Sequence, residues 1–368
     1  MLIPRAALAE AAAALRGPAA GLRVAAVEVD LDPLDLVRAG ASAFGAASYL
    51  GDPEGAERGG LGRAWSASAA GPGRLDALDA ALGEALPAGV EAFLGFSFAP
   101  TGPASPDWED FPAAAAHLPQ IGVVRRAGRA HLILAVPPGA NSAPVLAAAA
   151  TLRPPDAPDA PALRRARAVP AVSAWEEAVA AAADAARREG PAKVVLARTL
   201  HVVLERPPDP FDLVALLRER FPGCYPYGWQ AGAAVFIGAS PELLVERWGT
   251  RFSCRPLAGS AGRSADPGAD RRRGEVLLAD PKERAEHAFV VDEITAALRP
   301  LATTLEVPPG PVLHRLPGVQ HLATPISGTT GTRLLPLAAA LHPTPAVGGV
   351  PREAALAAIA AVEGFDRG

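Results

Sequence analysis

The stretch AAVFIGASPELLVERWGTRFSCRP (residues 233–256) contains three short runs of strand-forming residues close together. These runs are residues 233–238, 243–248 and 251–256. Gly249-Thr250 separates the second run from the third, which is the spacing of a two-residue hairpin turn. Strands joined by such short connections pair antiparallel, because a parallel pair needs a long crossover. The stretch therefore predicts an antiparallel sheet.

Helical patterns lie on both sides of this stretch. The sequence predicts a helix over 173–188, followed by one β-branched strand from Lys193 to Glu205. Downstream, Asp280 and Pro281 suit the N-cap and first position of a helix that continues to about residue 298. Two more helices are expected over 334–341 and 352–362. Helices combined with an antiparallel sheet indicate an α+β fold.

The N-terminal half has weaker patterns. A short Ala-rich helix is expected at the N-terminus, and strand-like runs occupy 24–29 and 130–136 between Gly and Pro turns. Residues 149–171 are rich in Pro and Ala and have no periodic pattern, which favours a surface linker.

Composition excludes several classes of protein. The 368 residues are 50% hydrophobic, which is enough for a large core, and the net charge is -4 without a long basic block, so nucleic acid is not an expected partner. The two cysteines lack metal-site spacing and are too few for a disulfide framework. No apolar run approaches the roughly 20 residues of a membrane span. We expect a cytoplasmic protein without a membrane segment.

Two glutamates near the start of the helix at Pro281 are candidate metal ligands. Glu283 and Glu286 are three residues apart, so they share one helix face. Glu283 also stands where a capping-box carboxylate would bond back to Asp280, and the two roles can coexist. Glu286 is either a solvated carboxylate or a ligand. Carboxylate oxygens favour Mg²⁺, whereas the neighbouring His287 would add a ligand only for a softer metal.

Acid–base candidates occur elsewhere in the chain. Glu242 follows an apolar strand and is either a solvated turn residue or a half-buried acid whose raised pKa suits proton donation. Lys193 is either a solvated lysine at a strand start or a buried base. The loop PLAGSAGR (residues 256–263) is either a turn or a binder of a carboxylate or phosphate through its N–H groups. His321, in QHLATP, is either structural or catalytic.

In chain order these segments resemble the successive motifs of chorismate-utilising enzymes, a family that includes isochorismate synthase, salicylate synthase, and the anthranilate and aminodeoxychorismate synthase components. The similar segments are KVVLAR, GASPELL, PLAGSAGR, DPKERAEH, HLATP, HPTPAVGG and EGFDRG. The resemblance implies an α+β fold with two antiparallel sheets enclosing helices. It implies an N-terminal variable part over residues 1–165 and a chorismate-binding core over residues 166–368.

The resemblance also implies roles for individual residues. Lys193 matches the general base that activates water, and Glu242 matches the general acid that protonates the departing hydroxyl. Glu286 matches a Mg²⁺ ligand, and Glu283 a second acidic residue at the metal. Substrate-binding roles are implied for four further residues: Gly259, Ser260, His321 and Ala323. The small Ala323 stands where relatives that use an amine or aromatise the ring usually differ.

The motifs HPTPAVGG and FDR look most like isochorismate synthase, which implies a Mg²⁺-dependent monomer acting on chorismate. Salicylate synthase, which goes on to eliminate pyruvate, is an alternative. An inactive chorismate-binding remnant is another, because relatives continue beyond EGFDRG and the core is expected to lack its last segment. The sequence does not separate a menaquinone role from a siderophore role.

Overall fold

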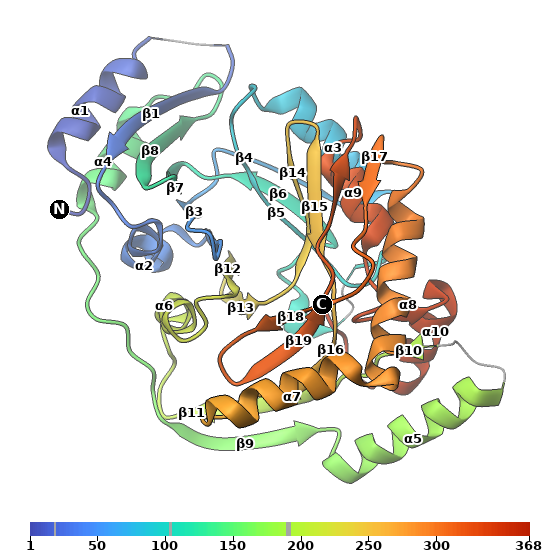
Figure 1. Ribbon diagram of the computed structural model, residues 1–368. Coiled ribbons are helices and arrows are strands. Elements are labelled where there is room, and N and C mark those ends of the chain that lie inside the picture. Colours follow the sequence, from blue (N-terminus) through green and yellow to red (C-terminus); the bar gives the residue numbers. More distant parts are fainter. Residues whose placement is uncertain (18–19, 103–104, 189–192) are drawn as a thin grey trace. The chain divides into compact units, whose positions relative to one another are not determined.

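The computed structural model describes residues 1–17, 20–102, 105–188 and 193–368 (Figure 1). The chain divides into two compact units. Unit 1 comprises residues 1–162 and 206–241 with Gly368, and unit 2 comprises residues 163–205 and 242–367. The chain therefore crosses between the units more than once, whereas the sequence placed a single boundary after residue 165.

Unit 1 is built on a seven-stranded sheet with the strand order β1-β8-β7-β3-β2-β12-β13 and a smaller sheet with the order β4-β6-β5. Its strands are β1 (Arg23–Val29), β2 (Ala47–Gly51), β3 (Glu57–Leu61), β4 (Trp65–Ala69), β5 (Phe93–Phe96), β6 (Ala114–Leu118), β7 (Ile121–Arg126), β8 (Arg129–Val136), β12 (Tyr225–Ala231) and β13 (Ala234–Ser240). Its helices are α1 (Arg5–Ala14), α2 (Pro33–Phe44), α3 (Arg74–Ala85), α4 (Ala143–Thr151), α6 (Pro210–Arg220) and the short 3₁₀ helix η1 (Pro106–Trp108).

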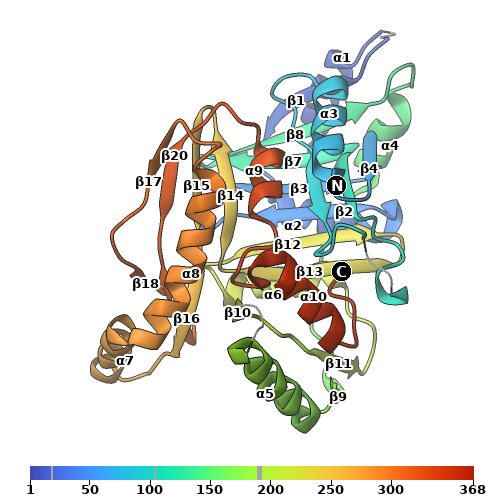
Figure 2. The ribbon, with the colours of Figure 1, turned by 90° about the vertical axis from the view of Figure 1, so that its right-hand side faces the viewer.

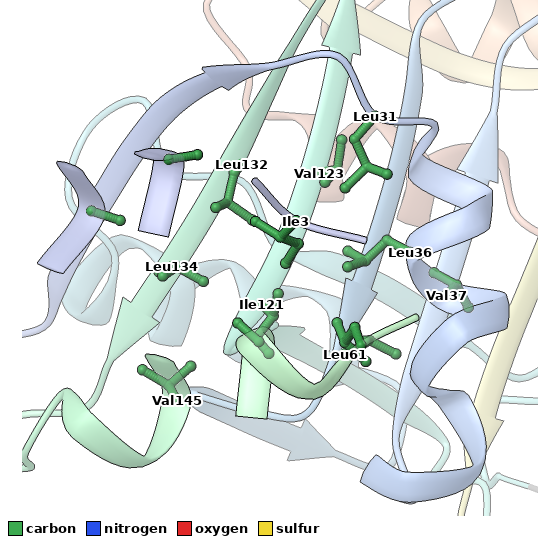
Figure 3. Packing of buried hydrophobic residues seen from close by; sticks show 14 of the residues in the cluster. Ile3, Leu31, Leu36, Val37, Leu61, Ile121, Val123, Leu132, Leu134 and Val145 are labelled. Atoms are coloured by element: carbon green, nitrogen blue, oxygen red, sulfur yellow. The ribbon is translucent and has the colours of Figure 1, made fainter. Parts of the chain in front are cut away.

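The core of unit 1 lies on one face of β7 and β8 (Figure 3). Ile121 and Val123 alternate with outward residues along β7, as Leu132 and Leu134 do along β8, so that all four point to the same side. Leu36 of α2 belongs to the same fully buried cluster. Full burial of each such side chain stabilises the fold by roughly 1.5–3 kcal/mol.

Unit 2 contains two larger sheets, with the orders β14-β15-β20-β17 and β16-β19-β18, and the two-stranded pairs β10-β21 and β11-β9. Its strands are β9 (Leu163–Val169), β10 (Lys193–Val194), β11 (Thr199–Leu204), β14 (Leu243–Trp248), β15 (Arg251–Arg255), β16 (Leu257–Gly262), β17 (Thr304–Glu306), β18 (Val312–Arg315), β19 (Val319–Ala323), β20 (Ile326–Thr329) and β21 (Gly349–Val350). Its helices are α5 (Val172–Arg188), α7 (Pro267–Ala279), α8 (Pro281–Leu298), α9 (Leu334–Leu341) and α10 (Arg352–Val362).

Helix α8 forms much of the core of unit 2 (Figure 2). Val290, Ile294 and Leu298 recur every four residues, so they form one buried stripe along the helix. Phe252 of β15 and Ile326 of β20 belong to the same cluster, which fixes α8 against that sheet. Throughout the described part of the chain, no helix is both long enough and apolar enough to cross a membrane.

Several expectations are confirmed. Every strand pairing in the described residues is antiparallel. The hairpin β14–β15 turns at Gly249, whose φ of 58° is a left-handed conformation that glycine adopts without strain. Four helices fall where they were expected: α5, α8, α9 and α10.

Three expectations are wrong in detail. Strand β13 pairs with β12 in unit 1, so the first run of the opening stretch does not share a sheet with the other two. The strand expected over 193–205 is interrupted at residues 195–198, whose backbone bonds go to another segment and to a side chain. Part of the expected linker, residues 163–169, is strand β9 paired with β11.

The short pair β10–β21 depends on a glycine. Lys193 lies opposite Val350, and Val194 lies opposite Gly349. A Cβ atom on Gly349 would lie 2.1 Å from the carbonyl oxygen of Lys193 and 2.7 Å from Cβ of Ala355. Only glycine therefore allows the two backbones to approach this closely.

Substituting Gly349→Ala tests this close approach. We expect the free energy of unfolding to fall by about 1–3 kcal/mol, because the added methyl group overlaps a backbone oxygen that cannot move freely. Gly331→Ala is the control, since a Cβ there meets no atom within 4 Å. Urea denaturation of the three proteins measures the difference, and equal midpoints for all three would contradict the expectation.

Candidate active site

Lys193 opens strand β10 and forms an ion pair with a residue from α8. Its Nζ lies 3.3 Å from Oε1 of Glu286. The Lys193 side chain is 10% exposed and that of Glu286 is 41% exposed. The interpretation of Lys193 as a solvated lysine is therefore wrong, because the amine is largely withdrawn from water and faces a carboxylate.

Glu242 directly precedes β14 and is the most perturbed carboxyl group of unit 2. Burial raises its pKa from 4.5 to about 7, against two weaker effects that lower it. These are a 3.4 Å hydrogen bond from the Leu257 N–H to Oε1 and the positive charge of Lys193. Glu242 therefore holds its proton over much of the range below neutral pH, as a general acid must.

Glu283 does not cap its helix. Asp280 is the N-cap, and its carboxylate accepts from the N–H groups of Lys282 at 2.8 Å and Glu283 at 3.1 Å. The Asp280 N–H donates to the Val276 carbonyl at the end of α7, so it is not available to the Glu283 carboxylate. The capping-box interpretation is wrong because two helices follow each other directly.

Gly259 approaches the Glu283 carboxylate closely. The register of β16 against β19 shifts between Ala258 and Ser260, which places Gly259 in a β-bulge with a φ of 78°. A Cβ on Gly259 would lie 3.1 Å from Oε2 of Glu283 and 3.3 Å from Cδ1 of Leu322. The bulge thus places the backbone of Gly259, which has no side chain, next to the Glu283 carboxylate.

Ser260 and His321 form a second pair across the same strands. Ser260 lies opposite His321 in the register, and Ser260 Oγ lies 2.7 Å from His321 Nδ1. Burial lowers the pKa of His321, so the ring is neutral at physiological pH. Ala323 lies two residues further along β19, on the same side as His321, and is 1% exposed.

His287 is a buried structural histidine. It is 2% exposed, and its Nε2 lies 2.7 Å from Oγ1 of Thr324. Burial lowers its pKa, so the ring is neutral. His287 lies on the buried side of α8. A histidine next to Glu286 in the sequence could be a buried residue or a metal ligand, so the sequence alone did not decide between the two roles.

The acidic residues of α8 fit a hard metal ion. In the described part of the chain, no group of three or more His, Cys, Asp or Glu side chains is arranged to hold a metal. Mg²⁺ is normally held by one or two carboxylates, with waters and substrate oxygens completing its coordination. Glu283, 22% exposed, and Glu286, 41% exposed, supply two carboxylates that remain accessible to water. Their donor chemistry therefore suits Mg²⁺ bound together with an anionic substrate.

Unit 2 brings the Lys193 amine and the Glu242 carboxyl group within electrostatic range of each other. The Lys193 charge acts on Glu242 and on His287, and its amine is paired with Glu286. These groups come from β10, the start of β14, and α8. Glu283 with Gly259, and Ser260 with His321, lie along β16 and its neighbours. The arrangement therefore places an amine and a protonated carboxyl group in the same unit as two accessible carboxylates.

Comparison with known proteins gives a consistent family. Residues 11–368 match the sequence model described as chorismate binding enzyme. Isochorismate synthase EntC of Escherichia coli is 40% identical over 204 residues, covering 55% of this chain and 52% of that protein. Isochorismate synthase DhbC of Bacillus subtilis is 42% identical over 186 residues, covering 48% of this chain and 47% of that protein. The chain spans about half the length of these relatives.

Solved structures agree with these matches. The menaquinone-specific isochorismate synthase MenF of Escherichia coli superposes with a TM-score of 0.84 and 26% identity, covering 98% of this chain and 84% of that one. Anthranilate synthase component I of Streptococcus pneumoniae, at 20% identity and a TM-score of 0.60, shares the fold. The predicted α+β fold of chorismate-binding enzymes is confirmed.

The raised pKa of Glu242 predicts a pH-dependent stability. Its folded-state pKa of about 7 exceeds the ordinary 4.5, so the folded protein binds this proton more tightly than the unfolded chain does. The resulting stabilisation is fully present below about pH 4.5 and is lost as the pH rises through about 7. Relative to Glu242→Gln, the unfolding free energy of the unsubstituted protein should fall by roughly 3 kcal/mol across this range.

Urea denaturation of both proteins from about pH 4 to about pH 9 measures this difference. If the unfolding free energies of the two proteins changed with pH in the same way, the assignment of a buried, proton-binding Glu242 would be contradicted.

Proposed function

This chain belongs to the chorismate-binding enzyme family, and we propose that it converts chorismate to isochorismate by adding water at C2 while the C4 hydroxyl group leaves. The observation that carries the proposal is the buried Glu242, whose pKa of about 7 is accompanied by the largely buried amine of Lys193 in the same unit. Support also comes from relatives that are named isochorismate synthases.

The leaving group requires an acid. Hydroxide leaves a carbon atom slowly unless it is protonated, and Glu242 retains a proton close to neutral pH because it is buried. A positioned proton transfer of this kind contributes roughly 10²–10⁴-fold to the rate. After donation, the Glu242 carboxylate is stabilised by the Leu257 N–H and the charge of Lys193.

The nucleophile requires a base. Water attacks C2 only as its proton is removed, and the Lys193 amine accepts that proton when it is neutral. The Lys193 amine lies 3.3 Å from Oε1 of Glu286, so this ion pair has to open before the amine can meet the attacking water. The low exposure of Lys193 keeps bulk water away from the amine.

Glu286 and Glu283 would hold the Mg²⁺ ion, which supplies positive charge that neutralises and orients a ring carboxylate of chorismate. Without such a cation, the two carboxylates of α8 would repel a dicarboxylate substrate.

Four residues are proposed to contact the substrate: Gly259, Ser260, His321 and Ala323. The bulge at Gly259 interrupts the pairing of β16 with β19, and its backbone N–H groups are proposed to bind a carboxylate of the substrate. The Ser260 hydroxyl and the neutral His321 ring offer hydrogen bonds without net charge. Ala323, being small, leaves room beside them.

The direct test is incubation of the protein with chorismate and Mg²⁺, followed by chromatography of the products and an assay for pyruvate. Isochorismate without pyruvate supports the proposal. Salicylate with pyruvate identifies a salicylate synthase instead. Calorimetric binding of chorismate without turnover indicates an inactive chorismate-binding protein, and the absence of both binding and turnover contradicts the family-based proposal altogether.

Replacement of the proposed base gives a clear prediction because the chain has only two lysines, Lys193 and Lys282. Lys193→Ala should reduce isochorismate formation at least about 10²-fold while leaving the fold intact, since the proton acceptor is lost. Lys282→Arg is the control, because that side chain is 85% exposed and arginine keeps the positive charge 3.5 Å from Glu283, so turnover should be unchanged. Normal turnover in Lys193→Ala would show that another group is the base.

Replacement of the proposed ligands predicts a changed metal requirement. Glu286→Gln and Glu283→Gln should each raise the Mg²⁺ concentration needed for half-maximal binding by at least about tenfold. Glu275→Gln, which changes an exposed glutamate of α7, should leave this concentration unchanged. Isothermal titration with MgCl₂ measures the affinity directly, and identical affinities for all proteins would place the metal elsewhere.

A further inference from the structure

The segment EGFDRG contains a buried ion pair with no role in the chemistry described above. Glu363 follows the last turn of α10, and Arg367 lies four residues later. The side chain of Glu363 is 3% exposed and that of Arg367 is 13% exposed. Arg367 donates to Glu363 through both Nε, at 2.8 Å from Oε2, and Nη2. Two such contacts fix the relative orientation of the planar groups.

This pair also binds the backbone of two other segments. Arg367 Nη2 donates to the Val195 carbonyl at 2.7 Å, and Nη1 donates to the Val347 carbonyl at 2.6 Å. The Ala197 N–H donates to Oε1 of Glu363 at 2.5 Å. The pair therefore binds one segment that begins at Val195, two residues after Lys193. It also binds a segment that ends at Val347, two residues before Gly349.

Among the described residues, strand β10 has few backbone hydrogen bonds to hold it. It contains only Lys193 and Val194, and it pairs with the equally short β21. Beyond it the Val195 N–H donates to the Gly348 carbonyl at 2.8 Å, and the chain then leaves the sheet. A two-residue pairing supplies few hydrogen bonds, so its position depends on the contacts that follow it.

We propose that Glu363 and Arg367 form a positioning clamp that holds residues 195–197 against residue 347 and thereby fixes Lys193 beside Glu286. The clamp acts through the backbone and does not touch the reacting groups. The clamp matters for catalysis only if Lys193 is the base, as the proposed function states. The effect of the clamp on the position of Lys193 is independent of that function.

The charges of the pair suit this task. A carboxylate accepts the Ala197 N–H, and a guanidinium donates to two carbonyls while also donating twice to that carboxylate, whereas a neutral side-chain amide has only two N–H donors. Each of these backbone groups lies outside a helix or strand. The clamp supplies the partners that regular secondary structure would otherwise provide.

Competitive amine labelling tests the clamp without relying on catalysis. A limiting amount of acetic anhydride is added, and mass spectrometry gives the acetylation of Lys193 relative to Lys282. Lys282 serves as the internal standard, because it is the other lysine of the chain and is 85% exposed. In the unsubstituted protein Lys193, which is 10% exposed, should react several-fold more slowly than Lys282.

Two variants loosen the clamp with little change of size. Glu363→Gln weakens the ion pair, and Arg367→Lys removes the planar fork that reaches two carbonyls. In each variant the acetylation of Lys193 should rise several-fold towards that of Lys282. Asp270→Asn is the matched control, because it breaks another two-contact pair of unit 2, with Arg263, and should leave Lys193 unchanged.

The buried thiols report whether the variants remain folded. Cys224 and Cys254 are 5% and 1% exposed, and burial raises the pKa of Cys254 to about 12, so neither reacts readily with iodoacetamide in the folded protein. A rise in Lys193 labelling with protected cysteines supports the clamp. Unchanged Lys193 labelling in both variants overturns it, as does a rise seen only when the thiols also become reactive.

Kinetics with chorismate then separates the two proposals. If isochorismate is formed, kcat should fall about 10–100-fold in the variants with a small change in KM, because a misplaced base slows the chemical step. If the unsubstituted protein forms no isochorismate, the proposed function fails, and the labelling result still decides whether the clamp positions Lys193.

Discussion

A close backbone approach in unit 2, between Gly349 and the carbonyl of Lys193, is the constraint on which the candidate site depends. A Cβ on Gly349 would lie 2.1 Å from that carbonyl oxygen, so this position excludes every side chain. The approach allows β21 to pair with β10, and the Glu363–Arg367 pair holds the chain on either side of it. Because a strand of two residues carries Lys193, small changes in these contacts move the amine. The geometry at Glu286 is thus set largely by backbone contacts away from it.

A second physical effect, burial, gives the site its chemical character. Glu242 is a carboxyl group like the others of the chain, yet removal from water raises its pKa to about 7. His321 and His287 lose basicity for the same reason and stay neutral. Glu283 and Glu286 retain contact with water and stay available for a cation. One fold therefore supplies a proton donor, neutral hydrogen-bonding groups and anionic ligands within a short length of chain.

Much of the local structure could be predicted. The helix that begins at Pro281 and the hairpin at Gly249 follow from an N-cap and from a glycine turn, which act within a few residues. The interrupted strand after Lys193 could not be predicted, because its break depends on Glu363, far along the chain. The prediction that Glu283 caps the helix was wrong for a related reason. The donor it required is already used by the end of the preceding helix.

By itself the sequence determined the α+β class, the positions of most helices, the motifs of the family and the identity of the candidate groups. These features depend on residue type and on short spacings, which a linear chain displays directly. Only the tertiary structure decided which groups meet: Lys193 with Glu286, Glu283 with Gly259, and Ser260 with His321. It also decided that Glu242 keeps its proton up to about pH 7. The physical reason is that burial and charge at each site are created by residues distant in sequence, brought together by packing.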